Sequence, residues 1–326
     1  MAMAMAALPA WARAGRWRVL RRVLGAVLAL AGAVATPAGI VPERFGPDDV
    51  VLIVAPHPDD ETLCCAGVAQ RARAAGAQVA IVWLTSGDAF ELDAIVVEHR
   101  VHPGKAGLER LAHERMAEAR AAAGLLGIGA DSLFFLGYPD RGLQRLLGDR
   151  YFSSYRSRYT GADAVPYANA LAPGAAYQGR NLARDLAAVL DRLRPTLVLA
   201  PTPLDAHPDH RAAGELVMRL MGERAQLPRV TWWLVHALHH RPGMRHWPAP
   251  RGLHAGLELE PPRHVALAWH AWALSDAELS GKERALRAHR TQLEVMAPFL
   301  LAFVRRNELY ADEPLPSEPE LPALVP

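Results

Sequence analysis

The chain has 326 residues, of which 51% are hydrophobic and 21% are charged, so it is long and apolar enough to bury a large globular core. Its formal net charge of +2 at pH 7 leaves no basic excess, and nucleic acid is therefore excluded as an expected partner.

Residues 1–45 are predicted to be a targeting segment, either a cleaved signal peptide or an N-terminal membrane anchor. Five arginines precede an uncharged run over 23–42, within which Ala33-Val34-Ala35 has the form of a signal cleavage site. The apolar stretch lies between the length of a signal peptide and that of a spanning helix. We therefore expect an exported or membrane-anchored protein, associated with the membrane through residues 17–42. The basic residues leave the cytoplasmic face open as an alternative.

From residue 48 onward, short β-branched runs alternate with longer helical patterns. Strands are expected at 50–55, 78–85, 132–137, 196–200 and 230–235, and helices at 60–75, 108–126, 178–193 and 208–222. This alternation predicts an α/β fold, with a Rossmann-like, doubly wound, mostly parallel sheet that carries helices on both faces. No GxGxxG motif follows the first strand, so a nicotinamide cofactor is not expected.

Residues 149–178 show no clear periodicity and are expected to form a long loop over the carboxyl edge of the sheet. Tyrosines and arginines alternate irregularly along this segment. Such a loop suits a sugar ring that bears an anionic or polar aglycone, although a loop that packs its own aromatic rings fits equally well.

Two polar motifs follow predicted strands. His57-Pro58-Asp59-Asp60 comes directly after the run 50–55, and His207-Pro208-Asp209-His210 follows the strand at 196–200. In an open α/β sheet, ligands bind at the carboxyl ends of the strands. The two motifs together therefore predict a divided site at this edge.

Imidazole and carboxylate groups from separated loops, with one coordination position left open, are the ligand set of a catalytic divalent metal. His57 supplies one imidazole, and of the two aspartates one binds the metal while the other acts as general base. Of His207 and His210, one binds the metal and the other stabilises charge. The alternative is that Asp59 or Asp60 only caps the helix that begins near Glu61.

The chain resembles the PIG-L/LmbE family of metal-dependent N-acetylglucosamine deacetylases. Besides the two motifs, the resemblance rests on TSGD at 85–88, RMAEARAAAGLLG at 115–127, LGYPD at 136–140 and KERALRAHRTQ at 282–292. It implies a deacetylase domain over 46–311, followed by a Pro/Glu-rich tail at 312–326.

The resemblance also implies roles for individual residues. His57, Asp60 and His210 would bind Zn²⁺, or another divalent metal such as Fe²⁺. Asp59 would be the general base, and His207 would stabilise the oxyanion or protonate the leaving amine. The expected substrate is a small molecule, glycolipid or glycan that contains N-acetylglucosamine.

Four further residues are expected around the site. Asp209 would adjust the properties of the pocket without binding the metal itself. Asp205 would orient an imidazole by accepting a hydrogen bond from its ring N–H. Asp88 would contact a sugar hydroxyl, and Arg115 would pair with Glu118 or with Asp88. Two other functions stay open: a metal-dependent phosphoesterase, and a non-catalytic, membrane-tethered glycan-binding protein.

Overall fold

The structure is a computed structural model that describes residues 41, 44–98, 104–224, 228–237, 247–248, 256–263 and 265–312. All of them lie in one compact unit, residues 40–326. The predicted targeting segment lies outside the described residues, apart from Val41, Arg44 and Phe45, and the tail is described only at Asp312. The domain boundaries at 46 and 311 therefore stay predictions.

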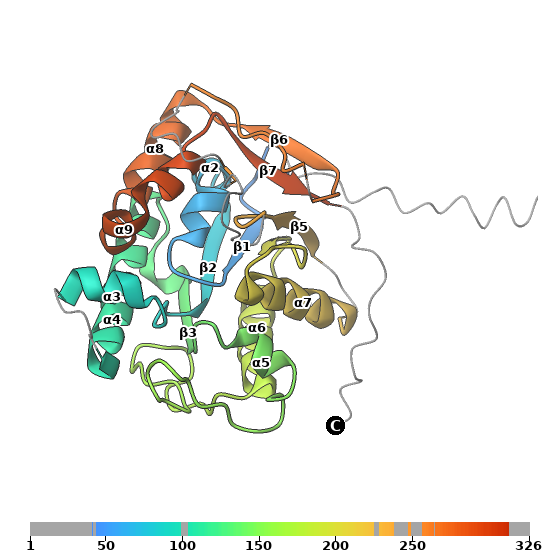
Figure 1. The fold of residues 1–326 in the computed structure, drawn as a ribbon. Coiled ribbons are helices and arrows are strands. Elements are labelled where there is room, and N and C mark those ends of the chain that lie inside the picture. The colour runs from blue at the N-terminus through green and yellow to red at the C-terminus, as the bar shows by residue number, and fades with distance from the viewer. Residues whose placement is uncertain are drawn as a thin grey trace, which may run out of the picture. The chain divides into compact units, whose positions relative to one another are not determined.

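The described residues form a seven-stranded sheet in the order β3-β2-β1-β4-β5-β7-β6 (Figure 1). The first five strands along the chain pair in parallel. They are β1 (Val50–Ala55), β2 (Gln78–Thr85), β3 (Leu133–Tyr138), β4 (Leu197–Pro201) and β5 (Arg229–Trp233). Two strands that the sequence did not predict, β6 (Trp269–Ala273) and β7 (Asn307–Ala311), extend the sheet in antiparallel fashion beyond β5.

Helices cover both faces of this sheet (Figure 1). On one face, α2 (Asp60–Ala74) and α4 (Gly104–Leu125) both pack against α8 (Asp276–Leu286), while α3 (Glu91–Glu98) contacts α9 (Arg290–Leu300). On the other face, α5 (Leu143–Leu147), α6 (Gly179–Leu193) and α7 (Pro208–Gly222) pack together. Short 3₁₀ turns occupy Ala130–Ser132 and Leu301–Phe303. The predicted doubly wound α/β fold is confirmed.

The sheet places β1 at its centre, between β2 and β4. Residues 51–55 are fully buried, as expected for a parallel strand that is covered on both faces and therefore reads as a continuous apolar run. The chain runs from β1 outward to β2 and β3, and then returns to add β4 on the other side. This reversal opens a crevice at the carboxyl ends of β1 and β4, where open α/β sheets bind ligands.

The segment 149–178 is irregular, as expected from its sequence, with one isolated bridge between Ala164 and Ala176. It is anchored at the carboxyl edge of the sheet, because the buried Tyr167 hydroxyl donates to Asp88 just after β2. The backbone N–H of Leu171 also donates to the carbonyl of Phe135 on β3. The loop therefore borders the crevice.

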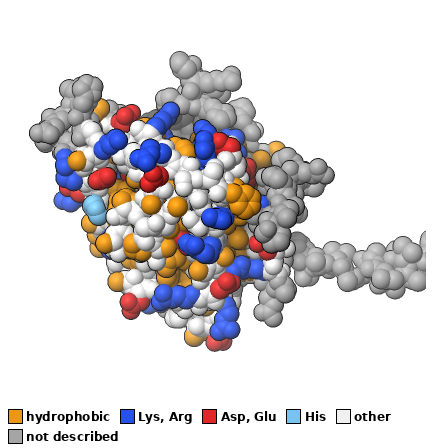
Figure 2. Space-filling model, turned by 90° about the horizontal axis from the view of Figure 1, so that it is seen from below, with side chains coloured by type: hydrophobic (Ala, Val, Ile, Leu, Met, Phe, Trp, Pro, Cys, Tyr) orange, Lys and Arg blue, Asp and Glu red, His pale blue; other side chains and the backbone are white. Residues whose placement is uncertain are grey.

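The prediction of an exported or membrane-anchored protein is wrong for the part of the chain that the structure describes. No helix in the described part of the chain is both long and apolar enough to cross a bilayer. Most of the segment 17–42 on which the prediction rested lies outside the described residues. On the face shown in Figure 2, basic and acidic side chains lie interspersed among uncharged ones.

Candidate metal centre and active site

The two polar motifs meet because their strands are neighbours. Asp59 is the residue that precedes α2 and Asp60 is the first residue of that helix, directly beyond the end of β1. His207 caps α7 beyond the end of β4, where its side chain accepts a hydrogen bond from the backbone of Asp209. Asp59 makes no such capping bond, so its buried carboxylate is not used to cap the helix.

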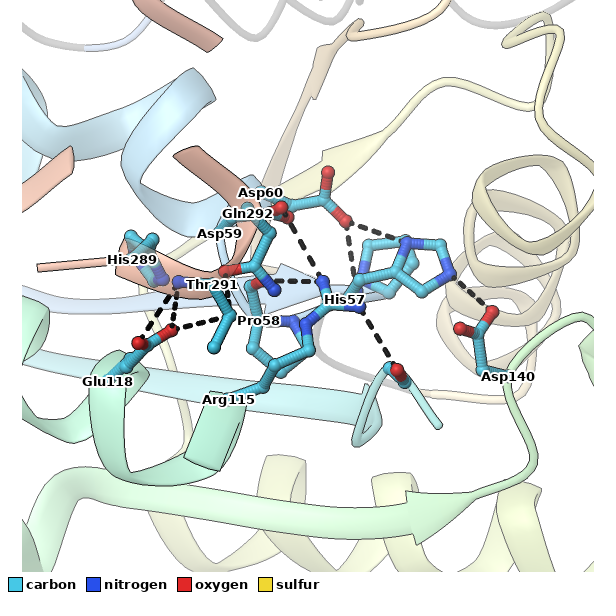
Figure 3. Close-up of polar contacts among 12 residues, drawn as sticks. His57, Pro58, Asp59, Asp60, Arg115, Glu118, Asp140, His289, Thr291 and Gln292 are labelled. Carbon is cyan, nitrogen blue, oxygen red and sulfur yellow. Dashed lines mark hydrogen bonds and ion pairs between the residues drawn. The ribbon is translucent and has the colours of Figure 1, made fainter. Parts of the chain in front are cut away.

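Asp60 lies between two imidazoles. Its Oδ2 atom is 3.2 Å from Nδ1 of His57 and 3.2 Å from Nε2 of His210. Figure 3 shows Asp60 next to His57. Nε2 of His210 is buried and makes no hydrogen bond. Ligand atoms around a tetrahedral ion bonded at about 2.0–2.1 Å lie about 3.3–3.4 Å apart. The donor types, the two separations from Asp60 and the unpaired nitrogen fit a divalent cation.

The other nitrogen of each imidazole faces a carboxylate. Nε2 of His57 lies 3.3 Å from Asp140 and 3.4 Å from Asp209, and Nδ1 of His210 lies 3.2 Å from Asp205. Carboxylates in this position fix the ring tautomer and raise the basicity of the nitrogen that faces a metal. Asp205 also accepts from the backbone N–H groups of Val235 and His236, so it fastens the second motif to the end of β5.

Two groups of side chains among the described residues have ligand atoms that all lie within 4.8 Å of one another. They are His57 with His207 and His210, and His57 with Asp140 and Asp209. In the second group the carboxylates already accept backbone N–H bonds. Asp209 accepts from Arg141 and Leu143, and Asp140 accepts from Ala89. These two carboxylates therefore support His57 from behind, whereas in the group of Asp60, His57 and His210 the Nε2 atom of His210 has no hydrogen-bond partner.

The electrostatic field of the carboxylates around His57 and His210 attracts positive charge. Although burial opposes it, the carboxylates of Asp140, Asp209 and Asp60 hold the pKa of His57 well above its usual range. Burial also opposes the change at Asp60, but His210 and His57 hold the pKa of that carboxyl well below its usual range. Several carboxylates surrounding two imidazoles would favour a cation between them.

Asp59 is held in place separately from this group. Burial raises its pKa to about 7, against the opposing effect of Arg115, whose guanidinium lies 3.5 Å away. Arg115 also donates to the carbonyl groups of Pro58 and Gly87 (Figure 3). Arg115 therefore pairs with Asp59. Glu118, one of the two partners expected for Arg115, instead accepts hydrogen bonds from Thr291.

A buried pair lies behind Asp59. Glu61 and His289 are both fully buried, and Oε1 of Glu61 lies 3.1 Å from Nε2 of His289. Glu61 also accepts from the indole N–H of Trp83 and from the backbone N–H of Asp59. The backbone of Asp59 has φ 130°, a value rare for residues with a side chain. These hydrogen bonds thus hold Asp59 in a strained conformation.

Two further histidines face the same space. Nδ1 of His207 accepts from the backbone of Asp209 at 3.2 Å, which leaves Nε2 as the protonated nitrogen. Burial and the neighbouring imidazoles lower the pKa of His207 to about 2, so the ring is neutral. His236, after β5, lies with its ring centroid 5.1 Å from that of His207 and 4.8 Å from that of His210.

A cavity of about 200 Å³ opens onto these groups. One wall is polar, and the other is apolar and largely built from α9, where the helix is interrupted at Met296. The lining residues are His57, Asp59, Asp60, Leu63, Phe90, Arg115, Asp140, Arg141, His207, Val235, His236, Met296, Phe299 and Leu300.

The structure brings together eight of the nine residues singled out from the sequence as metal ligands, catalytic groups or their direct supports. They are His57, Asp59, Asp60, Arg115, Asp205, His207, Asp209 and His210. Asp88 differs, because it is fully buried and its carboxylate accepts from the backbone of Asp140 and from Tyr167. It supports Asp140 and has no exposed surface for a sugar hydroxyl.

Sequence reasoning assigned no role to Asp140, His236 or His289. Asp140 and His289 do lie in the blocks 136–140 and 282–292, which were quoted for the family resemblance. Those blocks were the available signal for both residues. His236 carried no signal beyond its place after a predicted strand.

Comparisons with known proteins show the family of this chain. The family model described as GlcNAc-PI de-N-acetylase, PIG-L, matches residues 52–221. The 1D-myo-inositol 2-acetamido-2-deoxy-alpha-D-glucopyranoside deacetylase of Kribbella flavida is 28% identical over 295 residues, which cover 82% of this chain and 91% of that protein. The protein of the same name from Nocardia farcinica is 29% identical over 285 residues, covering 82% and 88%.

Among solved structures, the A40926 pseudoaglycone deacetylase Dbv21 is similar in fold, with a TM-score of 0.52 at 18% identity over 80% of this chain and 96% of that one. The family model covers more than half of the chain, and it includes both polar motifs and the strands that bring them together. The chain belongs to the PIG-L family, as its two motifs led us to expect.

Proposed function

We propose that the protein is a zinc-dependent N-acetylglucosaminyl deacetylase, an amide hydrolase that releases acetate and leaves a free amine. The proposal rests on Asp60, whose carboxylate lies 3.2 Å from a nitrogen of both His57 and His210, beside the buried Asp59. The relatives named above are deacetylases of a 2-acetamido-2-deoxyglucoside, which supports the choice of bond.

His57, Asp60 and His210 would hold the metal, and Zn²⁺ suits their nitrogen and oxygen donors, with Fe²⁺ as an alternative. Such a cation supplies a Lewis acid that polarises the acyl oxygen and lowers the pKa of a water molecule. Asp140 and Asp209 would keep Nδ1 of His57 turned toward the metal, and Asp205 would do the same for Nε2 of His210.

Asp59 would act as the general base. As the oxygen of a water molecule bonds to the acyl carbon, the carboxylate of Asp59 accepts a proton from that water. A pKa of about 7 suits this role, because a general base works best when its pKa lies near the working pH. Arg115 would aim the carboxylate, since its guanidinium is fixed by two backbone carbonyls.

The same carboxyl group would complete the reaction. An amine leaves readily only after its nitrogen is protonated, and Asp59 then carries the proton that it took from the water. Transfer of this proton to the nitrogen allows the C–N bond to break, so that acetate and the free amine are formed. His207 is a poor source for this proton, because its pKa is lowered to about 2.

His207 would instead stabilise the oxyanion. Its Nδ1 accepts a backbone hydrogen bond, and its Nε2–H is therefore available to donate to a negatively charged oxygen in the cavity. Asp88 would act at a distance, by holding the backbone of Asp140. The substrate would be a small molecule, glycolipid or glycan that carries N-acetylglucosamine.

The first experiment measures bound metal and acetate release from methyl N-acetylglucosaminide and N-acetylglucosamine 1-phosphate. We expect about one equivalent of metal. Asp59→Asn should keep the metal and lower kcat at least about 100-fold, the usual contribution of a general base. Asp191→Asn is the matched control, since Asp191 is exposed on α6 and should leave kcat unchanged.

Near-wild-type turnover by Asp59→Asn would rule out the proposed base. Separately, His57→Ala and His210→Ala should each lose bound metal, and unchanged metal content would rule out these ligands. Release of phosphate in place of acetate would identify a phosphoesterase. Sugar binding with no reaction would identify a non-catalytic glycan-binding protein.

A further inference from the structure

Arg141 occupies an unusual backbone position at the mouth of the cavity. It follows Asp140, its φ is 58°, and its exposed side chain lines the cavity. A left-handed conformation normally favours glycine. The backbone N–H of Arg141 donates to Asp209 at 2.6 Å, and that carboxylate lies 3.4 Å from Nε2 of His57. Only one carboxylate thus separates Arg141 from the first histidine of the site.

A second arginine approaches the same aromatic ring. The guanidinium of Arg141 lies 5.8 Å from the ring centroid of Tyr159, and that of Arg158 lies 4.7 Å from it. Arg158 also donates a hydrogen bond to the Tyr159 hydroxyl. Tyr159 belongs to the loop 149–178 and is half-buried. The Tyr159 ring therefore lies close to two guanidinium groups, that of Arg141, which lines the cavity, and that of Arg158, at distances typical of cation–π contacts.

Neither Arg141 nor Arg158 forms an ion pair with a carboxylate of the described residues, although Glu91 adds to the field at Arg158. Other arginines nearby are paired. Arg145 and Arg150 both contact Asp149, and Arg156 contacts Asp163. Arg141, at the cavity, and Arg158, on the other side of the Tyr159 ring contact, thus keep positive charge that no carboxylate of the described residues neutralises through an ion pair.

We infer that Arg141 and Arg158 bind an anionic group of the substrate, a phosphate or a carboxylate attached to the N-acetylglucosamine. A guanidinium presents paired N–H donors that match the oxygens of both groups. This inference rests on the proposed function, because it assigns a substrate class to the same cavity. It makes Arg141 and Arg158 determinants of specificity, apart from the groups that break the amide bond.

The test compares three sugars: methyl N-acetylglucosaminide, carboxymethyl N-acetylglucosaminide and N-acetylglucosamine 1-phosphate. The first two differ by one carboxylate, and the third separates phosphate from carboxylate as the preferred group. For the wild-type protein, kcat/KM should be about tenfold higher for at least one anionic sugar than for the neutral one, the effect of one hydrogen bond to a charged group. This preference should weaken as salt is added.

Arg141→Gln and Arg158→Gln should each lower that ratio of kcat/KM values, by about tenfold for Arg141→Gln. Arg141→Lys should retain part of the preference, and Arg141→Gly, which relieves the positive φ, should lose it while folding normally. Arg156→Gln is the matched control, because it removes the same charge from the same loop at a site neutralised by Asp163. Its ratio should equal that of the wild type.

Equal efficiency toward all three sugars, or a ratio unchanged in both arginine variants, would overturn the inference and leave the proposed function standing. If none of the sugars releases acetate, the proposed function fails instead. Calorimetric binding of the carboxymethyl and methyl sugars then decides the inference. Tighter binding of the carboxymethyl sugar that Arg141→Gln abolishes supports it, and equal binding by the wild type overturns it.

Discussion

The backbone conformation of Asp59 lowers the folding stability of the protein at its candidate site. Its φ of 130° lies outside the regions that residues with a side chain prefer. Such strain costs about 1–3 kcal/mol and persists only where the surroundings enforce it. Here Glu61 accepts the backbone N–H of Asp59 at 3.0 Å, and Glu61 is itself held by Trp83. A residue that only capped the helix would not need this conformation.

Replacing Asp59 by glycine and by alanine separates the strain from the carboxylate. Both variants lose the carboxylate and should be inactive, but only glycine adopts this φ freely. We expect Asp59→Gly to unfold with a free energy about 1–2 kcal/mol higher than Asp59→Ala, the reverse of the usual order within helices. Urea denaturation of the two proteins measures the difference. An alanine variant as stable as the glycine variant would contradict the strain.

At the scale of the elements, α2 is fixed by residues far from it in the sequence. Glu308 on β7 accepts backbone N–H bonds from Gly67 and Val68 in the middle of α2. It also pairs with Lys282 on α8 at 2.9 Å, and both side chains are only 1% exposed. Lys282 donates in addition to the carbonyl of Leu63. This buried pair joins α2, α8 and β7, and so holds the helix on which Asp60 lies.

Removing one member of this pair should be costly. Lys282→Met leaves Glu308 as an uncompensated buried charge and should lower the free energy of unfolding by about 3–5 kcal/mol. Adding Glu308→Gln should recover part of that loss, because the charge is then gone. Arg287→Met, which breaks an exposed pair with Glu283, is the control and should cost less than about 1 kcal/mol. Equal losses in Lys282→Met and the control would argue against the buried pair.

The elements with strong local signals were the ones predicted from the sequence. The runs that form β1 and β2 are apolar along almost their whole length, and α7 begins where His207 and Pro208 mark a helix start. In contrast, β7 carries buried polar residues, Asn307 and Glu308, whose partners come from other elements. Its position in the sheet depends on those contacts, which local periodicity does not encode.

The same limit applies to the site. The two motifs were singled out because they follow strands, whose ends lie at one edge of a parallel sheet. The choice of His57, Asp60 and His210 within them came from the family resemblance. The buried contact between Glu61 and His289 joins residues 228 positions apart, and only tertiary packing reveals it. Asp88 was expected to face the substrate, but the loop 149–178 covers it through Tyr167.

At the scale of the whole molecule, the proposed metal site would form only when the chain folds. The two halves of the centre come from neighbouring strands that are far apart in the sequence, and Asp60 meets His210 only when β1 and β4 pair. In the unfolded chain these side chains form no site. Binding of the proposed metal would therefore add to the free energy of folding.

Removing the metal should consequently lower Tm. At a free metal concentration 100 times the Kd, binding contributes about 2.7 kcal/mol, and a chelator should abolish this contribution. Thermal unfolding with chelator and after metal is restored measures the shift. His57→Ala should show little response to either treatment. A wild-type Tm that chelation leaves unchanged would contradict the coupling of metal binding to folding.

The contacts of α2 with β7 also set a lower limit on any shortened version of this enzyme. The family match ends at residue 221 and already contains both polar motifs. A fragment cut there would nevertheless lack His289, which contacts Glu61 behind Asp59, and Glu308, which contacts the middle of α2. A shortened or transplanted version must therefore include α8, α9 and β7. The segment with the two polar motifs depends on these elements for its packing and is not expected to fold alone.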